Sequence, residues 1–134
     1  MYCTYSHLYL FDLVCLLTSR SASSASDPVK LEADLVDSFQ TNVVGNVHLF
    51  GLFLPLVQKG QAKKVITITT GMADLDFINN FDIANGAPYT ISKAAMNAAI
   101  AKFNAEYKKD GVLFMGISPG LVNTGGNANP NRRH

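Results

Sequence analysis

The chain has 134 residues, of which 48% are hydrophobic and 16% are charged, and its formal net charge is +1. This composition fits one globular domain with a hydrophobic core, and the near-neutral charge argues against nucleic acid or a membrane as the partner. The two cysteines, Cys3 and Cys15, and the three scattered histidines form no ligand pattern, so we expect neither a metal site nor a disulfide framework. A reducing, cytoplasmic setting is therefore expected.

The first residues differ in character from the rest of the chain. Residues 8–17 are mostly apolar and residues 21–26 are small, which loosely resembles a secretion signal. The apolar run has no basic segment before it, is interrupted by Asp12, and is too short to span a bilayer. We therefore expect residues 1–27 to be a segment foreign to the domain that follows, or a buried strand. A cleaved leader ending near Ser26 is the alternative.

A long helix is predicted over residues 28–58. Asp27 and Pro28 form a helix start, with the aspartate as cap and the proline at the first helical position. Apolar side chains then recur at helical spacing. They are Leu31, Leu35, Phe39, Val43, Val47, Phe50 and Leu54. Gly60 ends the helix, and His48 is expected in the core or an interface.

The second part of the chain alternates between strands and a helix. The β-branched run 64–69 predicts a strand that is buried on both faces, and the apolar run 112–117 predicts a second buried strand. Between them, residues 70–88 are rich in Gly, Asn and Asp and predict a loop, and residues 89–109 predict an alanine-rich, closely packed helix. Residues 127–134 predict a disordered tail, since they show no apolar periodicity.

This order of elements predicts an α/β fold with parallel strands joined by a right-handed crossover. Sites in such sheets gather at the carboxyl ends of the strands. Thr69 and Thr70 end the first strand, Pro119 and Gly120 follow the second, and Tyr89 opens the helix between them. We therefore expect the chemistry of the protein at this edge.

Tyr89 and Lys93 are the most informative pair, because residues four positions apart lie on one face of a helix. There the ammonium favours the phenolate and draws the pKa of the tyrosine down, which suits a proton donor or acceptor for a carbonyl or alcohol oxygen. The alternative is an exposed helix start with a solvated lysine. Asn42 is a poor helix former inside the first helix; either it has a functional role or it bonds the local backbone.

Four segments together resemble the short-chain dehydrogenase/reductase family. Tyr-Thr-Ile-Ser-Lys at 89–93 is similar to its signature, and Ser-Pro-Gly-Leu-Val-Asn-Thr at 118–124 is similar to its segment beside the nicotinamide. Thr-Asn-Val-Val-Gly at 41–45 resembles the helix with the family's asparagine, and Val-Ile-Thr-Ile-Thr-Thr-Gly at 65–71 resembles the strand that ends in its serine. The long segment 71–88 is similar to fungal reductases and bacterial C-factor-like proteins.

The resemblance implies a partial Rossmann-type, doubly wound parallel sheet over residues 28–126. It implies that Tyr89 is the general acid or base and that Lys93 lowers the tyrosine pKa and bonds the nicotinamide ribose. Thr70 would hold the substrate oxygen in place of the family's serine, with Thr69 as a second candidate. Asn42 would hold a water that links Lys93 to solvent.

The resemblance also implies an NAD(P)-dependent oxidoreductase, with NADP favoured over NAD, that acts on a small carbonyl or alcohol substrate. Pro119, Gly120, Val122 and Thr124 would line the cofactor together with Tyr89 and Lys93. A homo-oligomer would form through the helices at 28–58 and 89–109.

The sequence departs from the family pattern in one large respect. No Gly-x-x-x-Gly-x-Gly segment, which would cradle the cofactor diphosphate, occurs before Asn42. We therefore expect a fragment that binds NAD(P)H weakly or not at all and has little activity alone. The alternative is a non-catalytic remnant that pairs with full-length relatives.

Overall fold

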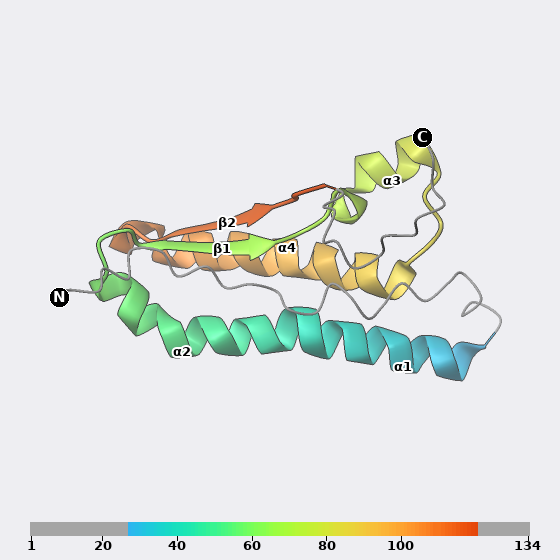
Figure 1. Cartoon of the computed structure of the whole chain (residues 1–134), viewed down its shortest axis with the longest axis horizontal. Helices are drawn as coiled ribbons and strands as arrows, with labels where there is room; N and C mark the ends of the chain where they lie inside the picture. Colours follow the sequence, from blue (N-terminus) through green and yellow to red (C-terminus); the bar gives the residue numbers. More distant parts are fainter. Residues whose placement is uncertain (1–26, 121–134) are drawn as a thin grey trace, which may run out of the picture.

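The computed structural model describes residues 27–120, and Figure 1 shows the order of its elements. That order is α1 (Pro28–Phe39), η2 (Gln40–Val44), α2 (Gly45–Lys59), β1 (Lys64–Ile68), η3 (Gly71–Ala73), α3 (Leu75–Phe81), α4 (Ala87–Tyr107), η4 (Lys108–Asp110) and β2 (Leu113–Ile117). Of the predicted segment 1–27, only Asp27 lies within the described residues. The end of the predicted domain, residues 121–126, and the predicted tail, residues 127–134, lie outside them. No helix in the described range is long and apolar enough to cross a membrane.

The predicted long helix is confirmed as a rod made of α1, η2 and α2 (Figure 1). Its start is capped as expected, since the Asp27 carboxylate accepts a hydrogen bond of 3.2 Å from the Lys30 N–H. The rod contains one irregularity, because η2 is a π-helical turn in which the Gly45 N–H donates to the Gln40 carbonyl. Such turns add a residue to the helical repeat and are frequent at functional sites.

The prediction that residues 70–88 form a loop is wrong in part, because the segment contains η3 and α3. The Asp74 carboxylate caps α3 by accepting from the Phe77 N–H at 3.0 Å, and Asp82 ends the helix in the left-handed conformation at φ 50°. Aspartates that suggest a loop by composition therefore act here as helix caps.

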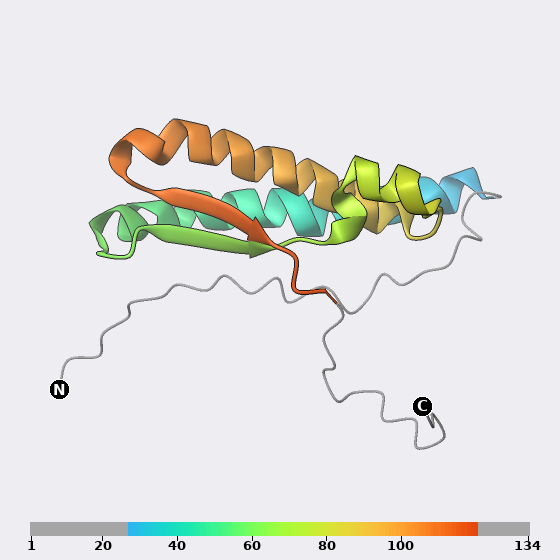
Figure 2. The same ribbon diagram turned by 90° about the horizontal axis from the view of Figure 1, so that it is seen from above.

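Strands β1 and β2 pair in parallel, in a register that runs from Lys64 opposite Leu113 to Ile68 opposite Ile117. Seen from above, α2 and α4 lie on the same side of this sheet (Figure 2). The predicted α/β fold with parallel strands, part of a Rossmann-type domain, is confirmed.

The prediction that β2 is a buried strand is wrong for one of its faces, and β1 is likewise fully buried only at alternate residues. Phe114 is buried, whereas Leu113 and Met115, its neighbours on the opposite face, are 41% and 39% exposed. The reason is the two-residue period of a strand, combined with helices that cover one face of the described sheet.

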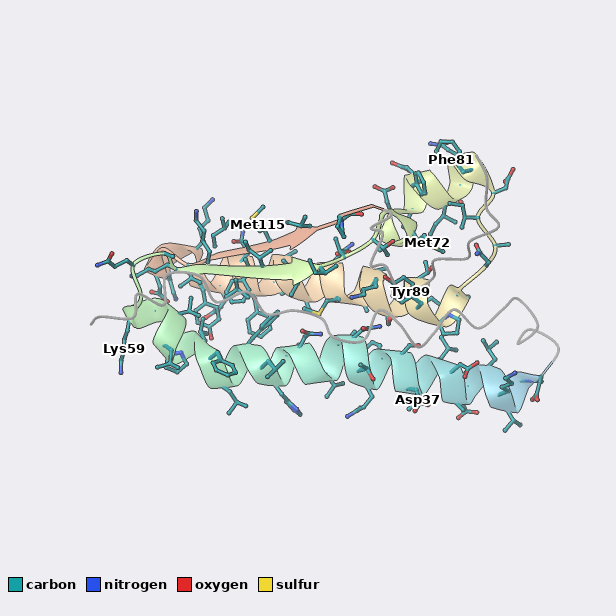
Figure 3. All side chains as sticks on the ribbon, in the orientation of Figure 1. Asp37, Lys59, Met72, Phe81, Tyr89 and Met115 are labelled. Atoms are coloured by element: carbon teal, nitrogen blue, oxygen red, sulfur yellow. The ribbon has the colours of Figure 1, made fainter. Side chains whose placement is uncertain are left out.

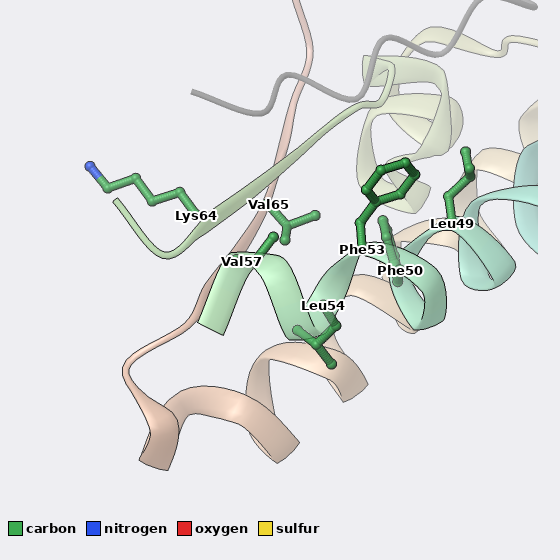
Figure 4. A pocket seen from close by; sticks show the side chains of 7 residues that line it. All are labelled: Leu49, Phe50, Phe53, Leu54, Val57, Lys64 and Val65. Carbon is green, nitrogen blue, oxygen red and sulfur yellow. The ribbon is translucent and has the colours of Figure 1, made fainter. Parts of the chain in front are cut away.

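The core lies between α2, α4 and the covered face of the sheet. Phe50 stands edge-on to Phe103 and Phe114, with ring centres 5.2 and 5.3 Å apart. Beside it, residues of α2 and β1 line a small, mostly apolar pocket of about 10 Å³ (Figure 4). His48 is exposed, so its predicted place in the core is wrong.

Candidate active site

The first turns of α4 carry the tyrosine and lysine of the predicted site. Gly86 precedes the helix in the left-handed conformation, at φ 69°, and Pro88 occupies its first turn. The Lys93 Nζ lies 5.9 Å from the centre of the Tyr89 ring, so the two side chains lie close together, as expected. Figure 3 labels Tyr89 near the start of α4, and Met72 of η3 on the neighbouring segment.

Lys93 is buried, with 1% of its surface exposed, and its Nζ donates to the Ile68 carbonyl at 3.0 Å. Ile68 is the last residue of β1, so the ammonium lies at the carboxyl end of the strand. A buried charge is costly unless polar groups satisfy it. The alternative of a solvated lysine is therefore wrong.

Asn42 lies in the π-helical turn and is buried. Its Nδ2 donates to Ser92 Oγ at 2.9 Å, and Ser92 Oγ in turn donates to the Tyr89 carbonyl at 2.7 Å. The Asn42 carbonyl accepts from Asn46 Nδ2 at 3.0 Å. Asn42 therefore ties the first helical rod to the turn of α4 that holds Tyr89 and Lys93.

Sequence reasoning missed Ser92 and Asn46. Both carried a signal, since Ser92 stands beside Lys93 in the signature and Asn46 is a second asparagine within the same predicted helix. The signal at Ser92 does not identify its partner Asn42, because the two residues lie 50 positions apart.

The two threonines at the end of β1 have different partners. Thr69 Oγ1 donates to Asn97 Oδ1 of α4 at 2.7 Å. Thr70 Oγ1 accepts from the Met72 N–H at 3.2 Å and thereby caps η3. A hydroxyl that accepts a hydrogen bond still has its own hydrogen to donate. Of the two candidates, Thr70 therefore fits better as a donor to a substrate oxygen.

The segment after β2 contributes Pro119 and Gly120, which are both exposed. Gly120 has φ 72°, and no atom lies within 4 Å of the position that a Cβ would take. Val122 and Thr124 lie outside the described residues. Among residues 27–120, no group of His, Cys, Asp and Glu is arranged to hold a metal ion.

The sequence pattern of the family described as "short chain dehydrogenase" matches residues 19–134. The chain belongs to this family. The resemblance seen in the four motifs is therefore confirmed, and the family consists of enzymes that generally use NAD or NADP as cofactor.

Three fungal relatives are similar to the chain. The short chain dehydrogenase virK of Hypocrea virens is 60% identical over 100 residues, which cover 75% of this chain and 37% of the relative. The short-chain dehydrogenase/reductase iacC of Pestalotiopsis fici is 54% identical over 96 residues, covering 72% of this chain and 35% of the relative. AacuF of Aspergillus aculeatus, which has the same description, is 47% identical over 117 residues, covering 84% and 44%. The chain thus spans less than half the length of these curated relatives.

Proposed function

We propose that this chain supplies the proton-transfer part of an NAD(P)-dependent oxidoreductase that interconverts a carbonyl and a secondary alcohol. The observation that supports this most directly is the buried Lys93 ammonium, which lies 5.9 Å from the Tyr89 ring and donates to the carbonyl at the end of β1. A cation close to a phenolic oxygen favours the tyrosinate over the phenol, and the proposal assigns this effect to Lys93. The pair thus suits proton exchange with a substrate oxygen.

Each side chain has a distinct role in this proposal. Tyr89 donates its phenolic proton to the carbonyl oxygen in reduction and accepts it back in oxidation. Thr70 donates a hydrogen bond to the same oxygen and orients it. The nicotinamide supplies or accepts the hydride when it is bound. Asn42 holds a water between Lys93 and solvent, a role supported by its buried link through Ser92 to the turn of α4 that carries Lys93.

The described residues fit the nicotinamide end of the cofactor. Lys93 and Tyr89 offer donors for a ribose, and the open backbone at Gly120 allows a ring to approach closely. The diphosphate end has no matching glycine-rich turn in this sequence before Asn42. We therefore propose that the chain alone binds the dinucleotide weakly or not at all. We also propose that the active form prefers NADP as its cofactor and that it is located in the cytoplasm.

The decisive experiment fuses this chain to the glycine-rich half of a relative such as virK and measures oxidation of NADPH and NADH with a panel of carbonyl compounds. Tyr89→Phe should lower kcat by about 10²- to 10⁴-fold, the usual contribution of a general acid. The matched control is Tyr107→Phe, because Tyr107 lies at the other end of α4 and packs against Phe103 in the core. Equal activity of Tyr89→Phe and the unmodified fusion would refute the assignment.

We also propose that the partner of this chain is a second copy, docked through α1 and α2. The outer surface of this rod exposes large apolar side chains, among them Val36 at 58%, Leu52 at 72% and Leu56 at 58%. Apolar surface gathered on one element is typical of an interface. The same surface would serve a non-catalytic remnant that pairs with full-length relatives, and the turnover of the fusion separates these two functions.

Sedimentation of the purified chain tests this interface. We expect a dimer or tetramer for the natural sequence and a monomer for the Leu52→Glu, Leu56→Glu double variant. The control is Leu75→Glu, because Leu75 is 71% exposed but lies on α3. A natural chain that sediments as a monomer at all concentrations would contradict the proposal.

A further inference from the structure

Two residues of α4, one helical turn apart, hold the last two residues before Thr70. Lys93 Nζ donates to the Ile68 carbonyl at 3.0 Å, and Asn97 Oδ1 accepts from Thr69 Oγ1 at 2.7 Å. The Thr69 N–H also donates to the Ile117 carbonyl at 2.9 Å. This hydrogen bond lies just beyond Ile68 and Ile117, the last paired residues of the two strands. The end of β1 is therefore fixed both to β2 and to α4.

Thr69 and Asn97 meet beside Gly116 of β2. A Cβ at Gly116 would lie 3.2 Å from the Thr69 methyl carbon and 3.7 Å from Asn97 Oδ1. The absence of a side chain at position 116 thus leaves the space in which Thr69 and Asn97 meet.

We propose that Asn97 is a positioning residue, which acts through Thr69 to hold the Thr70 hydroxyl at a constant separation from Tyr89. This inference rests on the proposed function. In that function Lys93 divides its three donors between the Ile68 carbonyl and a cofactor ribose. The bond between Thr69 and Asn97 ties the strand end to α4 independently of the lysine.

Thr67 provides a matched comparison within the same strand. It is 1% exposed, and its Oγ1 donates to the Met115 carbonyl of β2 at 3.3 Å. Loss of that hydroxyl alters a bond inside the sheet and leaves the bond to α4 in place. Thr67→Val is therefore the control for the loss of a threonine hydroxyl from β1 without the loss of positioning.

Amide hydrogen exchange of the isotope-labelled chain tests the proposal without any cofactor. The Thr69 amide reports the strand end, and the Met72 amide reports the Thr70 hydroxyl that it contacts. In Thr69→Val and Asn97→Ala we expect exchange at these two amides to rise about fivefold, the effect of one net hydrogen bond. Thr69→Ser keeps the hydroxyl and should restore slow exchange, and Thr67→Val should leave both amides unchanged.

A uniform rise in exchange at all amides of Asn97→Ala would overturn the inference, because a purely structural residue changes the global opening of the protein and not one site. No rise in exchange at Thr69 and Met72 would overturn it as well. In the active fusion, Asn97→Ala and Thr69→Val should lower kcat about fivefold with KM unchanged, and Thr69→Ser should recover kcat. A fusion without turnover would count against the proposed function, whereas the exchange result would still decide the role of Asn97.

Discussion

At the scale of single residues, the site is organised by buried polar side chains that find partners on other elements. Asn42 and Ser92 are 5% and 1% exposed and form a hydrogen bond between the helical rod and α4. Ser38 is buried one turn before Asn42, and its hydroxyl has no hydrogen-bond partner within residues 27–120. Removing a buried hydroxyl that forms a hydrogen bond costs more stability than removing one that forms none. Only the first removal leaves a buried partner group unsatisfied.

These two serines predict opposite responses to the same substitution. Ser92→Ala leaves the Asn42 amide without its acceptor, so we expect the free energy of unfolding to fall by about 1–3 kcal/mol. Ser38→Ala removes an unsatisfied hydroxyl from a helix and should be neutral or stabilising by a few tenths of a kcal/mol, roughly. Urea denaturation followed by circular dichroism measures both. A larger loss for Ser38→Ala than for Ser92→Ala would contradict this account.

At the scale of elements, short local signals decide where helices begin and end. Asp27 and Asp74 each accept from the N–H group three positions later, and each starts a helix. The first cap can be predicted from the sequence because a long apolar periodicity follows it. The second starts a seven-residue helix, which is too short to show a period and is therefore hidden within a stretch rich in turn-forming residues.

The cap of α3 can be tested directly. Asp74→Ala should weaken α3 by about 1 kcal/mol, because the Phe77 N–H loses its acceptor. We expect faster amide exchange at Phe77 and Ile78 and little change in α4. Asn79→Ala, at an exposed position within the same helix, should slow exchange, since alanine is the better helix former. Equal behaviour of the two variants would show that the cap does not stabilise α3.

At the scale of the whole molecule, the described sheet has one covered face. Phe114 lies among the rings of Phe50, Phe103 and Tyr107, whereas Met115 next to it points to the opposite face and is 39% exposed. Residues adjacent in a strand therefore contribute very differently to the stability of this chain, although both belong to one apolar run.

This asymmetry predicts unequal costs for truncating the two side chains. Phe114→Ala removes a core ring and should lower the free energy of unfolding by about 3–5 kcal/mol. Met115→Ala, on the exposed face, should cost about 1 kcal/mol or less, because the surface that it buries is small. Chemical denaturation of both variants gives the comparison. Similar losses would mean that the outer face of β2 is covered in solution.

Much of this protein is determined by its sequence alone. The rod over 28–58, both strands and the helix with Tyr89 and Lys93 follow from apolar periodicity, caps and turn residues, which act over a few positions. The four motifs establish the family for the same reason, since each is a short run whose spacing is local. The juxtaposition of Tyr89 and Lys93 also follows, because one helical turn sets it.

The tertiary structure alone decided which groups meet across elements. The bonds from Lys93 to Ile68, from Asn42 to Ser92 and from Thr69 to Asn97 join residues 25, 50 and 28 positions apart. Such contacts depend on how helices pack on the sheet, and no local periodicity encodes that packing. The sequence could not predict which face of β2 is covered for the same reason, since an apolar run does not specify which of its faces a helix will cover.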